Sequence, residues 1–97
     1  MVALVAHLTA SEGNAKRLEE LLRLLVERSR EENGVLQYTA HRDCDDESSF
    51  WMYEVYADDE ALAAHRARKP LEALGSAFHE AIATPPSITL LTPLASR

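Results

Sequence analysis

The sequence predicts an α+β fold in which an antiparallel four-stranded sheet carries its helices on one face. Four segments show the two-residue periodicity of strands, and helical periodicity separates the first from the second and the third from the fourth. The resulting order, βαββαβ, is the ferredoxin-like plan. Pro70 falls within the second helical stretch and divides it in two. With 97 residues, the chain is expected to form one domain over residues 1–97 around a single core.

The first half of the chain predicts a strand followed by a long helix. In Val2 to Thr9 one side is formed by Val2, Leu4, Ala6 and Leu8. A turn follows, and Asn14 is the predicted N-cap of a helix that runs to about Glu32. Its apolar stripe consists of Leu18, Leu21, Leu22, Leu25 and Val26. Gly34 is suited to the left-handed conformation that often follows a helix.

The second half predicts three strands and two helices. The expected elements are a strand from Val35 to Arg42, a polar loop over 43–48, a strand from Ser49 to Tyr56, a helix to about Arg68, a helix from Pro70 to Ala83, and a strand from Ser87 to Thr92. Asp58 is the predicted N-cap of the first of these helices. Leu71, Leu74, Phe78 and Ile82 are the predicted buried stripe of the second.

Strand pairing across the predicted loop distributes the side chains over two faces. If Arg42 lies opposite Ser49, one face carries Leu36, Tyr38, Ala40, Trp51, Tyr53 and Val55. This apolar and aromatic face suits the helices. The other, mixed face carries Val35, Gln37, Thr39, His41, Phe50, Met52, Glu54 and Tyr56. Helices can cover only one face of the sheet, so the mixed face needs another partner. We therefore predict a homodimer that forms through this open sheet face.

Composition restricts the partners and the location of the chain. The net charge of −6 argues against nucleic-acid binding, which needs clustered basic residues. No apolar run approaches the ~20 residues of a membrane span. The single cysteine, Cys44, allows no intrachain disulfide, and the N-terminal residues lack the pattern of a signal peptide. We therefore expect a cytoplasmic protein that contacts neither nucleic acid nor membrane.

A set of residues spread along the chain resembles the antibiotic biosynthesis monooxygenase domain, a member of the dimeric α+β barrel superfamily. The matching residues are Gly34, Leu36, Tyr38, Phe50, Glu54, Asp58, Ala61, Leu62 and His65. The resemblance runs from the first strand to the end of the third helix. It implies a homodimer, and it implies an oxygenase that acts on a quinol, phenolic or polycyclic aromatic molecule without metal or flavin.

The sequence also departs from that family's patterns. Pro70 and Leu71 stand where the commonest version has a second histidine and a phenylalanine, and Tyr56 replaces the usual tryptophan. The haem-degrading branch uses an Asn, a Trp and a His, and here Ala6, His65 and Gly75 fall at those places. Haem binding is therefore not expected.

His65 is the predicted catalytic residue. On its short helix it would face the apolar sheet face, where a neutral imidazole can accept a phenolic proton. The alternative is a histidine packed at a helix end with a local hydrogen bond. Arg66, Arg68 and Lys69 form a small basic cluster beside it, which could attract an anionic substrate or simply face solvent.

Three aromatic residues are the predicted substrate-binding wall. Trp51 and Tyr53 would form a flat apolar surface, and Tyr38 would supply a hydrogen bond. Ordinary packing between strands is the alternative for all three. Glu54 is costly to bury unpaired, so Gln37 or a basic group across the dimer interface is its expected partner.

The predicted function is a cofactor-independent monooxygenase whose partners are a small aromatic molecule, molecular oxygen and a second copy of the chain. No metal site is expected, because His41 and Cys44 together provide fewer ligands than a structural zinc needs. The alternative is a non-catalytic dimer of the same fold that binds a small apolar molecule.

Overall fold

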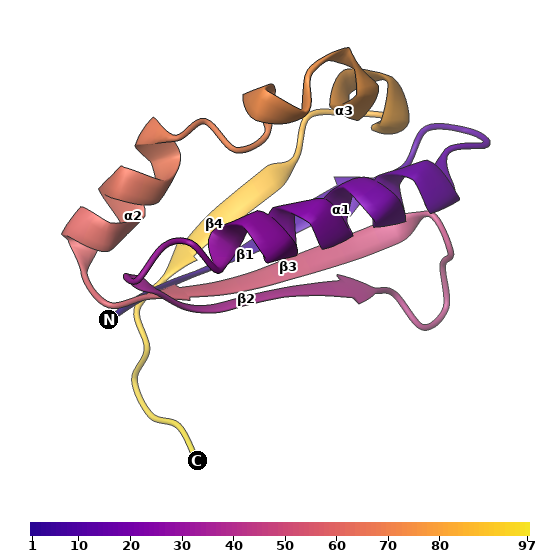
Figure 1. Ribbon diagram of the computed structural model, residues 1–97. Coiled ribbons are helices and arrows are strands. Elements are labelled where there is room, and N and C mark those ends of the chain that lie inside the picture. The colour runs from indigo at the N-terminus through magenta and orange to yellow at the C-terminus, as the bar shows by residue number, and fades with distance from the viewer.

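The computed structural model describes residues 1–97 and has an α+β architecture (Figure 1). Its elements are β1 (Val2–Thr9), α1 (Ala15–Ser29), β2 (Val35–Arg42), β3 (Ser49–Tyr56), α2 (Asp59–Ala67), the 3₁₀ helix η1 (Glu72–Leu74), α3 (Ser76–Ala81) and β4 (Ser87–Leu91). The four strands pair antiparallel in the order β2-β3-β1-β4. The helices lie on one side of the sheet and the C-terminal residues extend away on the other (Figure 1). The predicted fold class is confirmed. No helix combines the length and the apolar character needed to cross a membrane.

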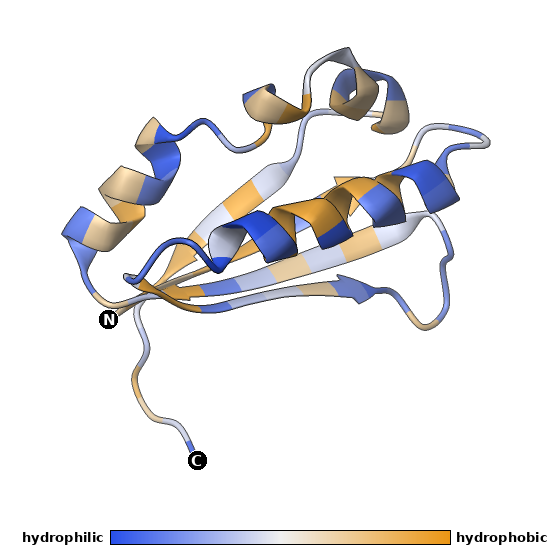
Figure 2. Ribbon diagram, viewed as in Figure 1, coloured by the Kyte–Doolittle hydropathy of each residue, from blue (hydrophilic) through white to orange (hydrophobic).

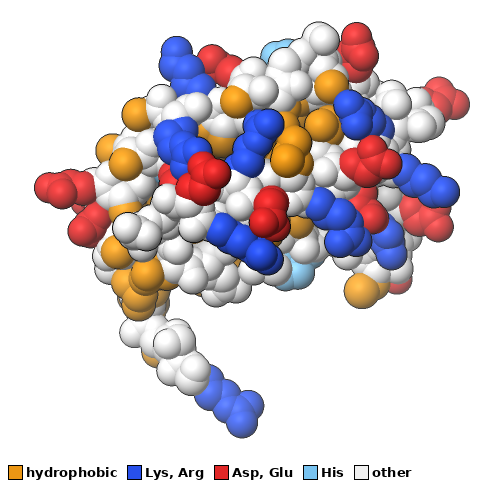
Figure 3. All heavy atoms as spheres, viewed as in Figure 1, with side chains coloured by type: hydrophobic (Ala, Val, Ile, Leu, Met, Phe, Trp, Pro, Cys, Tyr) orange, Lys and Arg blue, Asp and Glu red, His pale blue; other side chains and the backbone are white.

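Helix α1 is anchored on the sheet by one apolar stripe. Along the helix, hydrophobic residues recur among hydrophilic ones at the helical period (Figure 2). The stripe buries Leu18, Leu21, Leu22 and Leu25. The outward surface carries interspersed acidic and basic side chains (Figure 3), including the Arg23–Glu19 pair at 3.1 Å. The helix ends at Ser29, before the predicted end near Glu32.

Helix α2 begins where the sequence predicts and has a satisfied N-cap. The Asp58 side chain accepts a hydrogen bond from the backbone N–H of Ala61 at 2.8 Å. Asn14 occupies the N-cap position of α1 as predicted, but its side chain makes no capping hydrogen bond. Its side-chain amide instead donates to Ser11 Oγ at 2.8 Å, which closes the turn before the helix.

The predicted helix from Pro70 to Ala83 is not continuous. Gly75 has φ of 70°, a left-handed conformation that an α-helix cannot contain, and it separates η1 from α3. Phe78 is buried as predicted, whereas Leu71, Leu74 and Ile82 are only half-buried. The segment after α2 therefore meets the core as two short helical pieces, with Leu71 and Leu74 packed against it before Gly75 and Ile82 after it.

The β2–β3 hairpin starts in the predicted register and then shifts by one residue. Val35 lies opposite Tyr56 as expected, but a β-bulge between Val35 and Gln37 moves every later pair. Arg42 therefore faces Phe50 and not Ser49. Because side chains alternate between faces, this single-residue shift reverses the predicted faces of β3. The helix-facing residues of β3 are Phe50, Met52, Glu54 and Tyr56, and all four are buried.

Candidate active site

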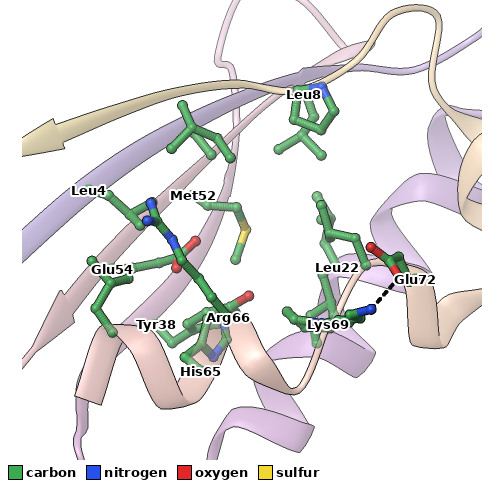
Figure 4. A pocket seen from close by; sticks show the side chains of 17 residues that line it. Leu4, Leu8, Leu22, Tyr38, Met52, Glu54, His65, Arg66, Lys69 and Glu72 are labelled. Atoms are coloured by element: carbon green, nitrogen blue, oxygen red, sulfur yellow. Dashed lines mark ion pairs between the residues drawn. The ribbon is translucent and has the colours of Figure 1, made fainter. Parts of the chain in front are cut away.

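A cavity of about 220 Å³ lies between the sheet and the helices α1 and α2 (Figure 4). Most of its lining is apolar, and it includes Leu4, Ala6, Leu8, Leu22, Leu25, Met52, Leu62, Leu71 and Ile88. Tyr38, Glu54 and His65 gather at one end, and Leu8 lies at the other (Figure 4). An apolar cavity with a few convergent polar groups is the usual form of a small-molecule site.

His65 is held in place by a carboxylate. It lies in the last turn of α2 and is 94% buried, with 6% of its surface exposed. Its Nδ1 lies 3.1 Å from both carboxylate oxygens of Glu32. A carboxylate accepts hydrogen bonds, so Nδ1 is the donor, and in the neutral form of the ring the lone pair lies on Nε2. The sequence expectation that His65 faces the space between helix and sheet is met, and its Nε2 is free to accept a proton.

Glu32 is itself fixed by a second partner. The residue follows α1 in the segment that leads to β2, and its side chain is only 13% exposed. Arg68 Nη1 lies 3.2 Å from Glu32 Oε2, and the same guanidinium reaches Glu31. The pair restrains the carboxylate, and through it the orientation of the His65 ring.

Tyr38 presents a hydroxyl group to the cavity. Its ring centroid lies 5.3 Å from that of His65. Tyr38 Oη makes no hydrogen bond within the chain. Every side-chain oxygen or nitrogen that is fully enclosed does have a hydrogen-bond partner, so Tyr38 Oη is not fully enclosed. The hydroxyl is therefore accessible, and the space beside it is the cavity (Figure 4). Burial raises the pKa of Tyr38, with smaller contributions from Glu54 and Glu32, so the hydroxyl stays protonated as a donor.

Glu54 lies next to Tyr38 on the neighbouring strand and also faces the cavity. The Tyr56 hydroxyl donates to its Oε1 at 2.5 Å. Oε2 has no partner within the chain, so by the same reasoning it opens to the cavity. Burial raises the pKa of the Glu54 carboxyl, and Glu32 adds to this, whereas the Tyr56 hydrogen bond, His65 and Arg66 lower it. The predicted pairing of Glu54 with Gln37 is wrong, because Gln37 lies on the other face and bonds Thr39.

Trp51 and Tyr53 do not lie beneath His65, and their predicted position in the cavity wall is wrong. They point to the open face of the sheet, where they are 40% and 36% exposed. Trp51 packs against His7 with ring centroids 4.3 Å apart, and its Nε1 donates to Asp43 at 3.4 Å. The bulge in β2 is the cause, since it reverses which face of β3 belongs with Tyr38.

Sequence reasoning did not connect Glu32 with the site, and it gave Glu54 a structural pairing and no place in the cavity. Glu32 is 33 residues from His65 along the chain, and no local pattern joins them. Glu54 carried a signal, because it shares its strand phase with the apolar Met52 and Tyr56. Of the basic cluster, Arg66 and Lys69 line the cavity, whereas Arg68 is used by Glu32. No group of three or more His, Cys, Asp or Glu side chains lies close enough together to hold a metal ion.

Comparison with known proteins shows the family of the chain. The sequence model of the antibiotic biosynthesis monooxygenase family matches residues 1–83. The chain belongs to the antibiotic biosynthesis monooxygenase family. PA3566 from Pseudomonas aeruginosa has 36% sequence identity and a TM-score of 0.86, over 97% of this chain and 94% of that one. No curated protein matches the chain.

Solved structures with lower sequence identity share the fold of this chain. Rv0793 from Mycobacterium tuberculosis is 24% identical, with a TM-score of 0.86 over 98% of this chain and 96% of its own. A crystal structure of an antibiotic biosynthesis monooxygenase is 23% identical, with a TM-score of 0.86 over 98% of this chain and 100% of its own. Pro70 and Leu71, the two positions noted above as departures from the pattern that the sequence resembles, both line the cavity.

Proposed function

We propose that residues 1–97 act as a single-domain monooxygenase on a small quinol, phenolic or polycyclic aromatic molecule, with His65 as the base. One observation carries this proposal. Three polar side chains, Tyr38, Glu54 and His65, each have an uncommitted atom at the same end of an otherwise apolar cavity. A planar ring with oxygen substituents matches that combination of apolar walls and convergent polar groups.

The size of the cavity favours the smaller members of this substrate class. Its volume is about 220 Å³. An engineered apolar cavity of ~150 Å³ binds benzene. One ring, or two fused rings, therefore fit within the cavity, and a larger polycycle would have to extend past the rim at Arg66 and Lys69.

The proposed reaction begins with proton transfer to His65. Nε2 accepts the proton of the phenolic hydroxyl, and the Glu32 carboxylate stabilises the imidazolium that forms. The resulting phenolate is electron-rich and reacts with molecular oxygen. Overall, a phenol with a ring C–H and one O₂ give a quinone and one water, so substrate and oxygen balance without a metal, flavin or external reductant.

Replacing His65 with Ala tests this assignment. We expect oxygen uptake with 1,4-dihydroxynaphthalene to fall by about a hundredfold or more, the usual contribution of a positioned base. Use of ¹⁸O₂ should place one labelled atom in the quinone formed by the wild type. His79→Ala is the matched control, because His79 is exposed on α3 outside the cavity. Oxygen uptake by the wild type no faster than without protein would contradict the proposal.

A non-catalytic binding protein is the second candidate. It is favoured by the apolar side chains of Pro70 and Leu71, which line the cavity where the family's commonest pattern has polar and aromatic groups. The same His65→Ala variant separates the two functions. Retained ligand binding with lost turnover supports the enzyme, and ligand binding by a wild type without turnover supports the binding protein.

We also propose that the chain forms a homodimer through the open face of the sheet. The helices leave this face uncovered (Figure 1), and Trp51 and Tyr53 are exposed on it together with the half-buried Val5 and Val55. Exposed aromatic side chains in a contiguous patch are typical of protein interfaces. A second copy of the chain therefore remains the proposed partner. The β3 residues proposed to contact it are Trp51 and Tyr53, whereas the sequence predicted that Phe50, Met52, Glu54 and Tyr56 would lie on this face.

A further inference from the structure

A tyrosine hydroxyl and a glutamate carboxyl group face the same end of the cavity from neighbouring strands. Tyr38 on β2 and Glu54 on β3 are direct cross-strand partners. Both line the cavity, and each has one oxygen without a partner in the chain, Tyr38 Oη and Glu54 Oε2. An uncompensated pair of polar atoms in an apolar cavity is costly unless a ligand or water meets it.

Burial favours the protonated form of Glu54, and the Tyr56 hydrogen bond decides which of its two oxygens would carry the proton. Tyr56 is fully buried, and its hydroxyl donates to Oε1. A proton on the carboxyl group therefore belongs on Oε2. Burial raises the pKa of Glu54, as does Glu32, against the opposing effects of the Tyr56 hydrogen bond, His65 and Arg66. Tyr38 remains a donor over the same range, because burial raises its pKa as well.

We propose that the hydroxyl of Tyr38 and the protonated carboxyl of Glu54 form an oxyanion-binding site that holds the phenolate oxygen of the ligand. Both groups donate a hydrogen bond into a site from which the apolar lining excludes most water, where such bonds to an anion are strong. The phenolic proton passes to His65 Nε2, and no other bond changes. The choice of a phenolic ligand rests on the proposed function.

The charge state of Glu54 decides the sign of its effect. As a carboxylic acid it donates to a phenolate, whereas as a carboxylate it repels one. The site therefore selects an ionised phenol only while Glu54 holds its proton. A Gln side chain at this position keeps an N–H donor at every pH, and a Met side chain fills similar space without a donor.

The test uses 4-nitrophenol, whose ionised form has a visible absorption band that the neutral form lacks. We expect the wild type to bind it as the phenolate at a pH where the free probe is mostly neutral. Glu54→Met and Tyr38→Phe should each weaken phenolate binding by about tenfold to a hundredfold, the range for a hydrogen bond to a charged group. Glu54→Gln should retain phenolate binding and keep it at higher pH, where the wild type loses it.

Glu47→Gln is the matched control, because it makes the same chemical change at an exposed position in the β2–β3 loop, outside the cavity. Its spectrum with the probe should equal that of the wild type. The proposal is overturned if the wild type produces no phenolate band, if Glu54→Met binds the phenolate as tightly as the wild type, or if Glu54→Gln loses it. The last result would identify Glu54 as a second base. Circular dichroism of each variant establishes that it is folded.

Oxygen uptake with 1,4-dihydroxynaphthalene, measured on the same preparations, separates this inference from the proposed function. A phenolate band without oxygen uptake supports the oxyanion site and contradicts the monooxygenase. Oxygen uptake without the band contradicts the oxyanion site and leaves the monooxygenase supported.

Discussion

At the scale of single residues, the chemistry of the site depends on which polar atoms already make hydrogen bonds within the chain. His65 uses Nδ1 for Glu32, and Glu54 uses Oε1 for Tyr56. In each case the second polar atom of the side chain is left for a ligand. The partners therefore do more than hold the side chains, because they determine which atom carries a proton and which faces the cavity.

Glu54→Gln should change how the free energy of unfolding depends on pH. Burial raises the pKa of Glu54 in the folded chain, so between the unfolded and folded pKa values only the folded chain holds this proton. The resulting stability is fully present below the ordinary Glu pKa of about 4.3 and is lost as the pH rises through the folded value. Because Gln does not titrate, the stability of the wild type relative to the variant should fall over this window.

Urea denaturation at several pH values between about 4 and 8 measures this difference, and the exposed Glu47→Gln change serves as its reference. Wild-type and Glu54→Gln stabilities that stay parallel across the range would contradict a Glu54 that holds its proton in the folded state.

At the scale of elements, the junction between α1 and β2 is packed tightly against α2. A Cβ at Gly34 would lie 2.5 Å from the Cβ of Ala61, which is far closer than van der Waals contact. The predicted left-handed conformation of Gly34 is wrong, since only Gly13 and Gly75 among the glycines have positive φ. Glycine is needed here because two backbones approach closely, and that approach helps to place α2 and His65 over the sheet.

Gly34→Ala should lower the free energy of unfolding by about 1–3 kcal/mol, the usual cost of overpacking. Ala61→Gly removes the opposing methyl group, so Gly34→Ala should cost less in that background than in the wild type. Urea denaturation of the two single variants and the double variant measures this coupling. Additive effects of the two substitutions would show that the contact is not responsible.

At the scale of the whole molecule, the sheet has two faces with different roles. One is covered by helices and encloses the cavity, whereas the other exposes Trp51 and Tyr53. Association through the second face would remove these aromatic side chains from water, which favours a dimer. It would also stabilise β3, the strand that carries Glu54.

Trp51→Glu should convert a dimer to a monomer, because it places a charge in the centre of the proposed interface. Light scattering at micromolar concentration measures the molar mass in solution. Leu24→Glu is the matched control: Leu24 is also 40% exposed, but it lies on α1, on the helical side of the sheet. A monomeric wild type at this concentration would refute the proposed association.

Much of the fold could be predicted because its signals are local. The apolar stripe of α1, the alternation in β1 and the Asp58 cap each depend on residues within a few positions of one another. The position of His65 over the sheet followed from the same helical period. Gly75 shows the limit of such reasoning, because the helical pattern continued through a residue whose conformation ends the helix.

The sequence by itself determined the βαββαβ order, an aromatic-rich strand from Ser49 to Tyr56 and a histidine at the end of α2. Only the tertiary structure decided what this histidine meets. A bulge of one residue in β2 exchanged Trp51 and Tyr53 for Met52 and Glu54 on the helical side of β3. Strand periodicity defines two sets of side chains but not which set is buried, since that depends on register and on residues distant in the chain. The contact of Glu32 with His65 was undetermined for the same reason.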